Sequence, residues 1–213
     1  MSAESSTPPF SIPEDLFGVL RRVLLPVGDP DIDPGDLKQA AVVALIGEAP
    51  QARDHTLLLI ERSAELPSHA GQLAFPGGKA EPGDRDLLDT ALREAEEEVG
   101  LDRAGVEVLG RLRPVPTPTG FMIVPFVARA PARWVPRPHD GEVRTILQPT
   151  LGTLADPKVY RISGRADWKG RTYDLYEFSI HRPPLWGATA RMVWELLVRM
   201  SYGPDPWPPS TMR

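Results

Sequence analysis

The sequence predicts a mixed α/β or α+β fold in which a β-sheet is sandwiched between helices. Short apolar runs rich in β-forming residues, bounded by Gly, Pro and Asp, indicate buried strands. Three other segments repeat apolar residues every three or four positions, as amphipathic helices do. With 213 residues and 41% hydrophobic content, the chain can bury a full core, so we expect a single domain over residues 1–213.

The N-terminal region begins with residues 1–12, which are rich in Ser, Thr and Pro and are expected to be mobile. A short amphipathic helix is then predicted from Pro13 to Val23, ended by Pro26. The Asp-rich stretch at 28–35 lacks the spacing of an EF-hand loop, so turn formation is the favoured interpretation over Ca²⁺ binding.

The strands and the last helix follow from the same patterns. Seven runs are predicted as strands: 40–46, 56–60, 106–113, 121–129, 143–147, 158–163 and 172–178. The last two are separated by residues 164–169 and should form a hairpin. A helix over 188–201 is then capped by Gly203, and residues 203–213 form a proline-rich tail.

Composition excludes several classes of protein. The chain has no cysteine, so it has no disulfide, thiolate nucleophile or thiolate metal site. It has no apolar run of membrane-spanning length and no signal-peptide pattern, so we expect a cytoplasmic protein without a membrane partner. A net charge of −5 argues against nucleic-acid binding. The oligomeric state is left open.

The most informative stretch runs from residue 77 to residue 101. Its second half predicts a helix over 87–99, with Asp86 as N-cap and Gly100 as C-cap. Four residues at helical spacing form an apolar stripe that should face a core: Leu88, Leu92, Ala95 and Val99.

Three carboxylates are expected together on another flank of this helix, because Glu94, Glu97 and Glu98 are related by steps of three and four residues. Like charges at this spacing repel, which favours either an open face or a bound cation. The segment 79–98 holds eight acidic and three basic residues, a net charge of −5 that equals the charge of the whole chain. The acidity is therefore local.

A glycine-rich loop before the helix favours the bound cation. Gly77 and Gly78 lack the Cβ atoms that would keep the backbone away from a ligand, and Lys79 follows them. Mg²⁺ and similar ions take a few carboxylates and bridge to substrate phosphates. The stretch is therefore a candidate metal and phosphate site. Arg93, four residues before Glu97, is expected to orient carboxylates by paired hydrogen bonds.

The spacing resembles the Nudix box of pyrophosphohydrolases, whose pattern is G-x5-E-x7-R-E-U-x-E-E-x-G-U, with U aliphatic. The matching residues are Gly78, Asp84 and Arg93-Glu94-Ala95-Glu96-Glu97-Glu98-Val99-Gly100-Leu101. Asp84 stands where the family has Glu, and eight residues instead of seven separate it from Arg93. The resemblance implies hydrolysis of a pyrophosphate linkage that depends on Mg²⁺ or Mn²⁺, held by Glu94, Glu97, Glu98 and the Gly78 carbonyl.

A second resemblance concerns the substrate. Arg62-Ser63, Gly71 and Phe75-Pro76-Gly77-Gly78 resemble the leader of the coenzyme A branch of Nudix enzymes, although Pro67 replaces a further Arg of that leader. Thr119-Gly120-Phe121 and Trp186-Gly187 resemble other landmarks of that branch. The resemblance implies a small-molecule substrate, coenzyme A, cleaved to 3′,5′-ADP and 4′-phosphopantetheine. The implied substrate contacts are Arg62, Ser63, Gly77, Gly78, Lys79 and Phe121.

Two questions stay open at this point. The general base is expected to be one of the box glutamates, with Glu142 in reserve, because it lies where Nudix enzymes often place an additional carboxylate. The substrate could instead be ADP-ribose or a nucleoside triphosphate, since the box specifies the chemistry and not the leaving group. A non-catalytic nucleotide-binding regulator on the same fold is a third hypothesis, which the intact Arg-Glu-x-x-Glu-Glu core disfavours.

Overall fold

The computed structural model describes residues 10–28, 34–49, 54–66, 69–168 and 171–204. In chain order its elements are α1 (Leu16–Val23), β1 (Lys38–Glu48), β2 (His55–Leu57), β3 (Leu59–Arg62), β4 (Leu73–Ala74), β5 (Gly77–Lys79), α2 (Leu87–Val99), the 3-10 turn η1 (Arg103–Gly105), β6 (Glu107–Arg111), β7 (Val115–Pro116), β8 (Phe121–Arg129), β9 (Val143–Leu147), α3 (Leu151–Ala155), β10 (Tyr160–Trp168), β11 (Arg171–Phe178), β12 (Leu185–Trp186) and α4 (Gly187–Tyr202).

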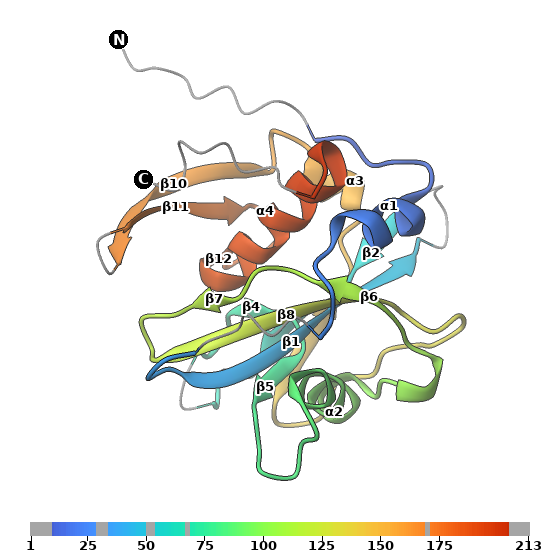
Figure 1. The fold of residues 1–213 in the computed structure, drawn as a ribbon, viewed down its shortest axis with the longest axis vertical. Helices are drawn as coiled ribbons and strands as arrows, with labels where there is room; N and C mark the ends of the chain where they lie inside the picture. Colours follow the sequence, from blue (N-terminus) through green and yellow to red (C-terminus); the bar gives the residue numbers. More distant parts are fainter. Residues whose placement is uncertain (1–9, 29–33, 50–53, 67–68, 169–170, 205–213) are drawn as a thin grey trace.

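A mixed sheet forms the centre of the fold (Figure 1). Its strand order is β2-β1-β8-β6, with β5 also paired to β1 and β7 to β8. The long strands β1 and β8 run parallel from the pair Lys38 and Phe121 to the pair Ile46 and Arg129, whereas β2, β5, β6 and β7 pair antiparallel. Two three-stranded sheets, β10-β11-β12 and β4-β3-β9, flank it. The predicted mixed α+β architecture is confirmed.

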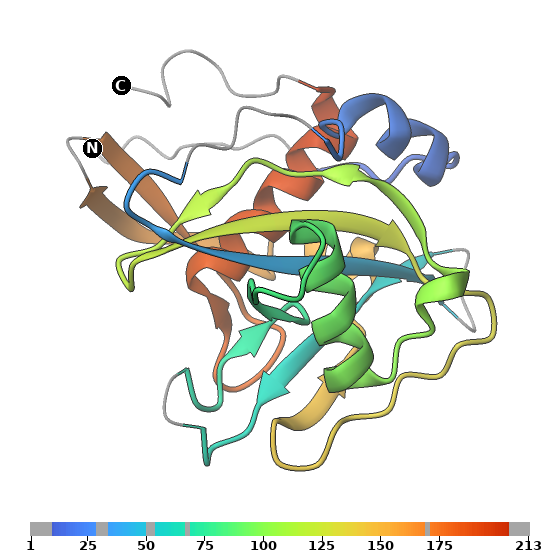
Figure 2. The same ribbon diagram turned by 60° about the horizontal axis from the view of Figure 1, so that its bottom comes forward.

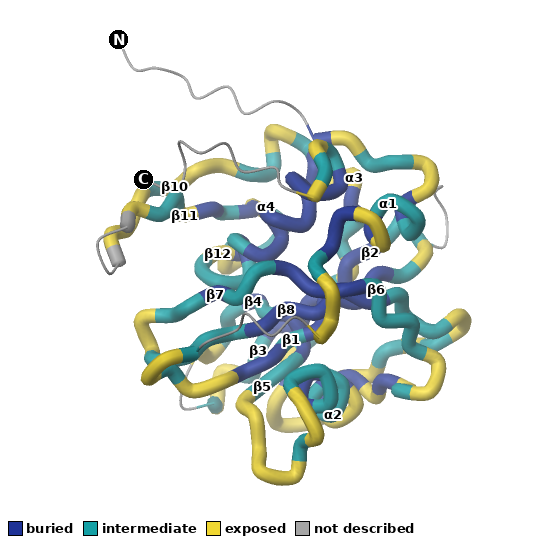
Figure 3. Tube along the Cα trace, viewed as in Figure 1, coloured by how far each residue is buried: buried dark blue, intermediate teal, exposed yellow. Residues whose placement is uncertain are grey.

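Alternation along β1 separates two hydrophobic clusters on the two faces of the sheet. Ala41, Val43 and Leu45 belong to the cluster under α2, whereas Ala44 and Ile46 belong to the cluster that contains α1 and α4. This period of two is what a strand buried on both faces requires. Figure 2 shows α2 crossing one face of β1 and β8 with α4 on the other, and Figure 3 shows the middle of both strands as buried.

The three predicted helices are present, and in α2 the caps explain both ends. Asp86 accepts a hydrogen bond from the Asp89 amide at 2.8 Å at the start of α2, and Gly100 ends it in the left-handed region at φ 64°. The apolar stripe is narrower than expected. Ala91, Ala95 and Val99 are fully buried, whereas Leu88 and Leu92 are only partly buried because they lie at the edge of the cluster.

The strands agree with the sequence at 121–129 and 143–147 but differ elsewhere. The run predicted at 56–60 is wrong as a single strand, because it is divided at Leu58 between β2 and β3, which belong to different sheets. The Gly77 to Lys79 segment was expected to be a loop and is the strand β5, paired with β1. The hairpin strands extend to Trp168 and Arg171, so the expected connection of 164–169 is shorter.

The chain ends also correct one expectation. Residues 1–9 and the tail from 205 lie outside the described residues, as do 29–33 of the Asp-rich stretch. Phe10, however, was expected to be mobile and is buried, with its ring 4.9 Å from Trp194 and 5.1 Å from Tyr160. An aromatic residue of this size is anchored by the area that it buries.

No helix in the described part of the chain is both long and apolar enough to cross a membrane.

Candidate active site

Strand β5 and helix α2 bring glycines and carboxylates into direct contact. A Cβ atom added at Gly78 would lie 2.3 Å from Oε1 of Glu94, so only glycine leaves room for this carboxylate. A Cβ atom added at Gly77 would lie 2.3 Å from the Ala41 carbonyl oxygen. The two glycines therefore allow β5 to lie between β1 on one side and the helix carboxylates on the other.

Glu98 is the most buried carboxylate of the helix. Its side chain is 2% exposed, and Oε2 accepts a hydrogen bond from the Gly77 amide at 2.9 Å. Nη1 of Arg62 lies 3.6 Å from Oε1. Burial raises the pKa of Glu98 to about 7, helped by the charges of Glu94 and Glu142 and opposed by the Gly77 hydrogen bond and Arg62. The Gly77 hydrogen bond and Arg62 therefore offset only part of the free-energy cost of burying the charged form of Glu98.

Glu94 shares this environment, whereas Glu97 does not. The Glu94 side chain is 17% exposed, and burial raises its pKa against the opposing charge of Arg93. The charges of Glu97 and Glu142 raise that pKa further. The Glu97 side chain is 56% exposed and accepts from Nη1 of Arg93 at 3.2 Å. The predicted three-carboxylate flank therefore consists of a buried Glu98, a partly buried Glu94 and an exposed Glu97.

Arg93 donates hydrogen bonds to carboxylates, and one of its partners is not the one that its helical spacing predicted. Nε and Nη2 donate to the two oxygens of Asp84 at 2.8 and 3.2 Å, and Nη2 lies 3.1 Å from Oε1 of Glu94. Asp89, four residues before Arg93, instead pairs with Arg85 and Arg103. The Asp84 hydrogen bond raises the pKa of Arg93, which stays fully charged.

Asp84 thereby gains a defined place. Besides Arg93, it accepts from the Thr90 hydroxyl at 2.8 Å and from the Glu81 amide at 2.9 Å. The hydrogen bonds from Arg93 and Glu81 hold the pKa of this carboxyl well below its usual range. Sequence reasoning missed Thr90, because its complete burial, which requires a partner for its hydroxyl, is seen only in the structure.

A separate segment brings Glu142 to the same place. The amide of His139 donates to the carbonyl of Glu98 at 2.9 Å and the amide of Arg137 donates to that of Val99 at 3.0 Å, so this segment satisfies carbonyls in the last turn of α2. The Ser63 amide donates to the Glu142 carbonyl at 2.8 Å. The exposed Glu142 is close enough for its charge to raise the pKa of both Glu94 and Glu98.

The remaining predicted substrate residues lie around this centre and differ in how far their side chains are engaged in contacts within the protein. The Ser63 hydroxyl accepts from the Glu65 amide at 3.3 Å and is part of its own turn. Nζ of the exposed Lys79 lies 5.6 Å from the centroid of the Phe121 ring, so β5 and the start of β8 place a cation beside an aromatic surface. Arg62 is 25% exposed, and its buried Nε has no hydrogen-bond partner within the described residues.

The side-chain types at this site suit a divalent cation, but the side chains are not arranged around a single point. The charge of Glu142 raises the pKa of both Glu94 and Glu98, and the charge of Glu94 raises that of Glu98, which is the electrostatic condition that a divalent cation relieves. Across the described ranges, no three carboxylate or imidazole groups converge on a single point. Glu97, the third predicted carboxylate ligand, is held by Arg93 at the exposed side of this cluster.

Another buried carboxylate, on β3, was not anticipated. Glu61 is 3% exposed, accepts from Arg144 at 2.9 Å and lies 3.2 Å from Nε2 of His181. It alternates with Arg62 along the strand and therefore points to the opposite face. We assign it no part in the site.

Comparisons with known proteins agree with the box. Residues 37–158 match the family described as NUDIX domain. A protein of Pectobacterium atrosepticum named uncharacterized Nudix hydrolase NudL is 36% identical over 168 residues, which cover 78% of this chain and 85% of that protein. Its namesake from Photorhabdus laumondii is 38% identical over 141 residues, which cover 66% of this chain and 75% of that protein.

Solved structures give weaker likenesses. A Nudix hydrolase of M. smegmatis, RenU, has a TM-score of 0.46 at 22% identity and covers 56% of this chain and 74% of its own. The NUDIX domain of Shewanella oneidensis NrtR, solved with ADP ribose, has a TM-score of 0.45 at 19% identity and covers 59% of this chain and 80% of its own.

Proposed function

Because this chain belongs to the Nudix family of hydrolases and is a diphosphatase, we propose that it cleaves coenzyme A to 3′,5′-ADP and 4′-phosphopantetheine with Mg²⁺ or Mn²⁺. The observation that carries the chemistry is the closeness of the buried Glu98 and the partly buried Glu94, packed against Gly77 and Gly78 beside Glu142. Carboxylates buried together in this way suit a site that binds cations.

We assign the metal ligands to Glu94, Glu97, Glu98 and the Gly78 carbonyl. When bound there, a divalent cation neutralises diphosphate charge and lowers the pKa of a bound water. The protein's own part is orientation: Gly77 fixes Glu98, and Arg93 holds Glu94 and Glu97 while Asp84 holds Arg93. Positioning before the reaction, together with electrostatic stabilisation, supplies most of the catalysis of phosphoryl-group chemistry.

The choice of coenzyme A rests on the leader resemblance and on the cations near the box. Arg62 is only loosely paired with Glu98 at 3.6 Å, so its guanidinium is available to a substrate phosphate. Lys79 offers a second cation, and the neighbouring Phe121 offers a surface for an adenine ring. Arg62, Ser63, Gly77, Gly78, Lys79 and Phe121 remain the proposed substrate contacts.

The metal chemistry is tested by Glu98→Gln. We expect kcat to fall by about 100-fold or more at saturating Mg²⁺, since a ligand or base is lost, and chelation of the metal to abolish turnover. Glu96→Gln is the matched control, because Glu96 lies on the same helix, is 56% exposed and pairs with Arg103 outside the cluster. A Glu98→Gln enzyme with near wild-type kcat would disprove the assignment.

The base is tested by pH–rate profiles of Glu94→Gln and Glu142→Gln. We favour a box glutamate and hold Glu142 in reserve. The variant that lacks the true base should lose the acidic limb of the kcat profile, because that limb reports protonation of the base. A variant that keeps the limb is excluded as the base.

The substrate is tested by competition among coenzyme A, its 3′-dephospho form, ADP-ribose and NADH at equal concentration. We expect the highest kcat/KM for coenzyme A, and we expect Arg62→Ala to narrow its advantage over the dephospho form. Arg85→Ala, at an 82% exposed side chain, is the control and should change neither value. Equal kcat/KM for ADP-ribose would refute the substrate, whereas failure on every diphosphate with Mn²⁺ would favour a non-catalytic regulator.

A further inference from the structure

A pocket lies at one end of the central sheet, where the parallel strands β1 and β8 both finish. It is lined by the last residues of β1 up to Glu48, by Arg129 at the end of β8 and by the segment 130–134. Its volume of 360 Å³ lies within the range of about 300–1,000 Å³ for small-molecule sites. The carboxyl ends of parallel strands are where α/β sheets commonly bind ligands.

This pocket is separate from the proposed active site. None of the box glutamates lines it. Ala41, which pairs with Gly78, precedes Glu48 by seven residues along β1, about 20 Å at the rise of a strand. A ligand in the pocket therefore occupies a second place on the molecule.

The charges in the pocket favour an anion. Two arginines, Arg129 and Arg133, face one glutamate, Glu48, which gives the lining a net charge of +1 on a chain of net charge −5. Arg129 is already paired with Glu48 at 2.9 Å and its guanidinium stacks 4.5 Å from the centroid of the Phe17 ring. Arg133 is exposed, and its side chain makes no hydrogen bond or ion pair within the described residues.

The backbone at Arg133 is strained. If the turn alone determined the residue at this position, a residue that tolerates this conformation would be expected. The Trp134 amide donates to the Pro131 carbonyl at 3.2 Å, so residues 131–134 form a turn with Arg133 at its third position. Its φ of 69° lies in the left-handed region, where this position of a turn favours Gly or Asn. Strained backbone conformations of this kind cluster at ligand-binding sites, where the side chain is required despite the cost of the backbone strain.

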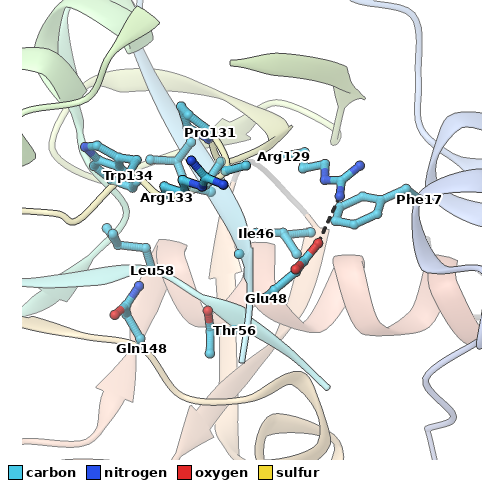
Figure 4. Close-up of a pocket in the computed structure, with 14 residues that line it drawn as sticks. Phe17, Ile46, Glu48, Thr56, Leu58, Arg129, Pro131, Arg133, Trp134 and Gln148 are labelled. Atoms are coloured by element: carbon cyan, nitrogen blue, oxygen red, sulfur yellow. Dashed lines mark hydrogen bonds and ion pairs between the residues drawn. The ribbon is translucent and has the colours of Figure 1, made fainter. Parts of the chain in front are cut away.

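An aromatic wall stands beside that cation. Figure 4 shows Trp134, Arg133 and Pro131 together on one side of the pocket, with Thr56 and Gln148 on another. The indole Nε1 of Trp134 donates to the Gly100 carbonyl at 2.7 Å, so α2 fixes the orientation of the ring. A fixed ring offers a stacking surface at low entropic cost.

We propose that this pocket binds a nucleoside monophosphate, with the base stacked on Trp134 and the phosphate held by Arg133 and Arg129. The class follows from the juxtaposition of one aromatic wall, two guanidinium groups and a space of mononucleotide size. Thr56 and Gln148 supply polar groups for the sugar or base. The proposal does not depend on the substrate of the catalytic site.

The test is calorimetric titration of the full chain with AMP in the presence of EDTA, alongside adenosine and inorganic phosphate. We expect AMP to bind at least about tenfold more tightly than either fragment, because both the ring and the charge contribute. Absence of AMP binding at millimolar concentration overturns the proposal. If adenosine binds as tightly as AMP, the assignment of the phosphate to Arg133 and Arg129 is overturned. If inorganic phosphate binds as tightly as AMP, the assignment of the base to Trp134 is overturned.

Variants assign the binding to this pocket. Arg133→Ala should weaken AMP about tenfold, the loss of one charge-assisted contact, and Arg133→Lys should stay within about threefold of wild type. Arg137→Ala, in the same segment but outside the pocket lining, and Glu98→Gln should leave binding unchanged. Unchanged binding in Arg133→Ala, or lost binding in Glu98→Gln, would place the ligand elsewhere.

Arg133→Gly gives an independent reading of the strain. Glycine adopts a φ of 69° freely, so this variant should unfold at a higher temperature than Arg133→Ala while binding AMP as weakly. An equal or lower unfolding temperature would remove the strain argument.

Discussion

Gly78 is required by the carboxylate of Glu94 and not by a turn, since a Cβ atom there would lie 2.4 Å from the Glu94 carboxyl carbon. The end of a flexible side chain can move aside, so Gly78→Ala should fold normally. The displaced carboxylate should nevertheless lower kcat by about 100-fold, the effect of misplacing a reacting group by about 1 Å.

Gly83→Ala is the control for this prediction, because no heavy atom lies within 4 Å of a Cβ atom added there. Steady-state kinetics of both variants, with circular dichroism to confirm folding, provide the measurement. Wild-type kcat in Gly78→Ala would mean that the position of Glu94 does not matter.

Glu98 makes the metal-free protein sensitive to pH in a direction opposite to most carboxylates. Its pKa is raised from 4.5 to about 7 on folding, so between these values the folded state holds the proton more tightly than the unfolded state. Stability should therefore fall as pH rises through this window, by up to about 3 kcal/mol. Glu98→Gln keeps the acceptor for the Gly77 amide and removes the charge.

Urea denaturation in EDTA at pH 5 and pH 8 measures this effect. The free energy of unfolding of Glu98→Gln, relative to that of the wild type, should be higher at pH 8 than at pH 5. Glu97→Gln, at a 56% exposed side chain, should show no such change relative to the wild type. If the free energies of unfolding of Glu98→Gln and wild type change equally between pH 5 and pH 8, folding does not raise the pKa of Glu98.

At the scale of elements, caps and periodicity predicted the helices, and long-range pairing decided what they could not predict. Helix α2 spans Leu87–Val99, as its N-cap and C-cap glycine indicated. Strand β5 was missed because two glycines carry no strand signal, and only its pairing with β1 makes it a strand. The division at Leu58 was missed because residues 57–60 form an uninterrupted apolar run with no turn-forming residue.

The candidate site shows the same limit. Spacing on one helix predicted that Glu94, Glu97 and Glu98 would lie on one flank, but it did not predict that Glu98 would be buried against β5, Glu94 partly buried and Glu97 exposed. It also could not predict that Asp84, nine residues before Arg93, would be the bidentate partner.

That partnership joins the segment before α2 to the helix and leads to a prediction. Because hydrogen bonds from Arg93 hold the pKa of Asp84 below its usual range, its charge stabilises the fold above pH 4 and this contribution is lost as pH falls. Asp84→Asn should therefore lower the unfolding temperature at pH 7, and the difference should shrink in acid. Asp140→Asn, at an exposed position, is the control. An undiminished difference in acid would contradict the role of charge.

At the scale of the molecule, the central sheet separates the cluster under α2, which supports the box, from the larger cluster that holds α1, α4 and the β10–β11 hairpin. Phe10 belongs to the larger cluster, where its ring meets Tyr160 and Trp194. The division implies that damage to one cluster should reach the other only through global unfolding.

Phe10→Ala tests this division. The variant should lose about 3 kcal/mol of unfolding free energy, as large-to-small changes of buried aromatic residues do. Well below its unfolding temperature it should keep wild-type kcat, because α2, the helix that carries the box glutamates, packs against the opposite face of the sheet. Urea denaturation and kinetics at 15 °C measure the two quantities, with Ser11→Ala, at an exposed residue, as control. A fall in kcat that accompanies the loss of stability at this temperature would show that the two faces are coupled in the folded state.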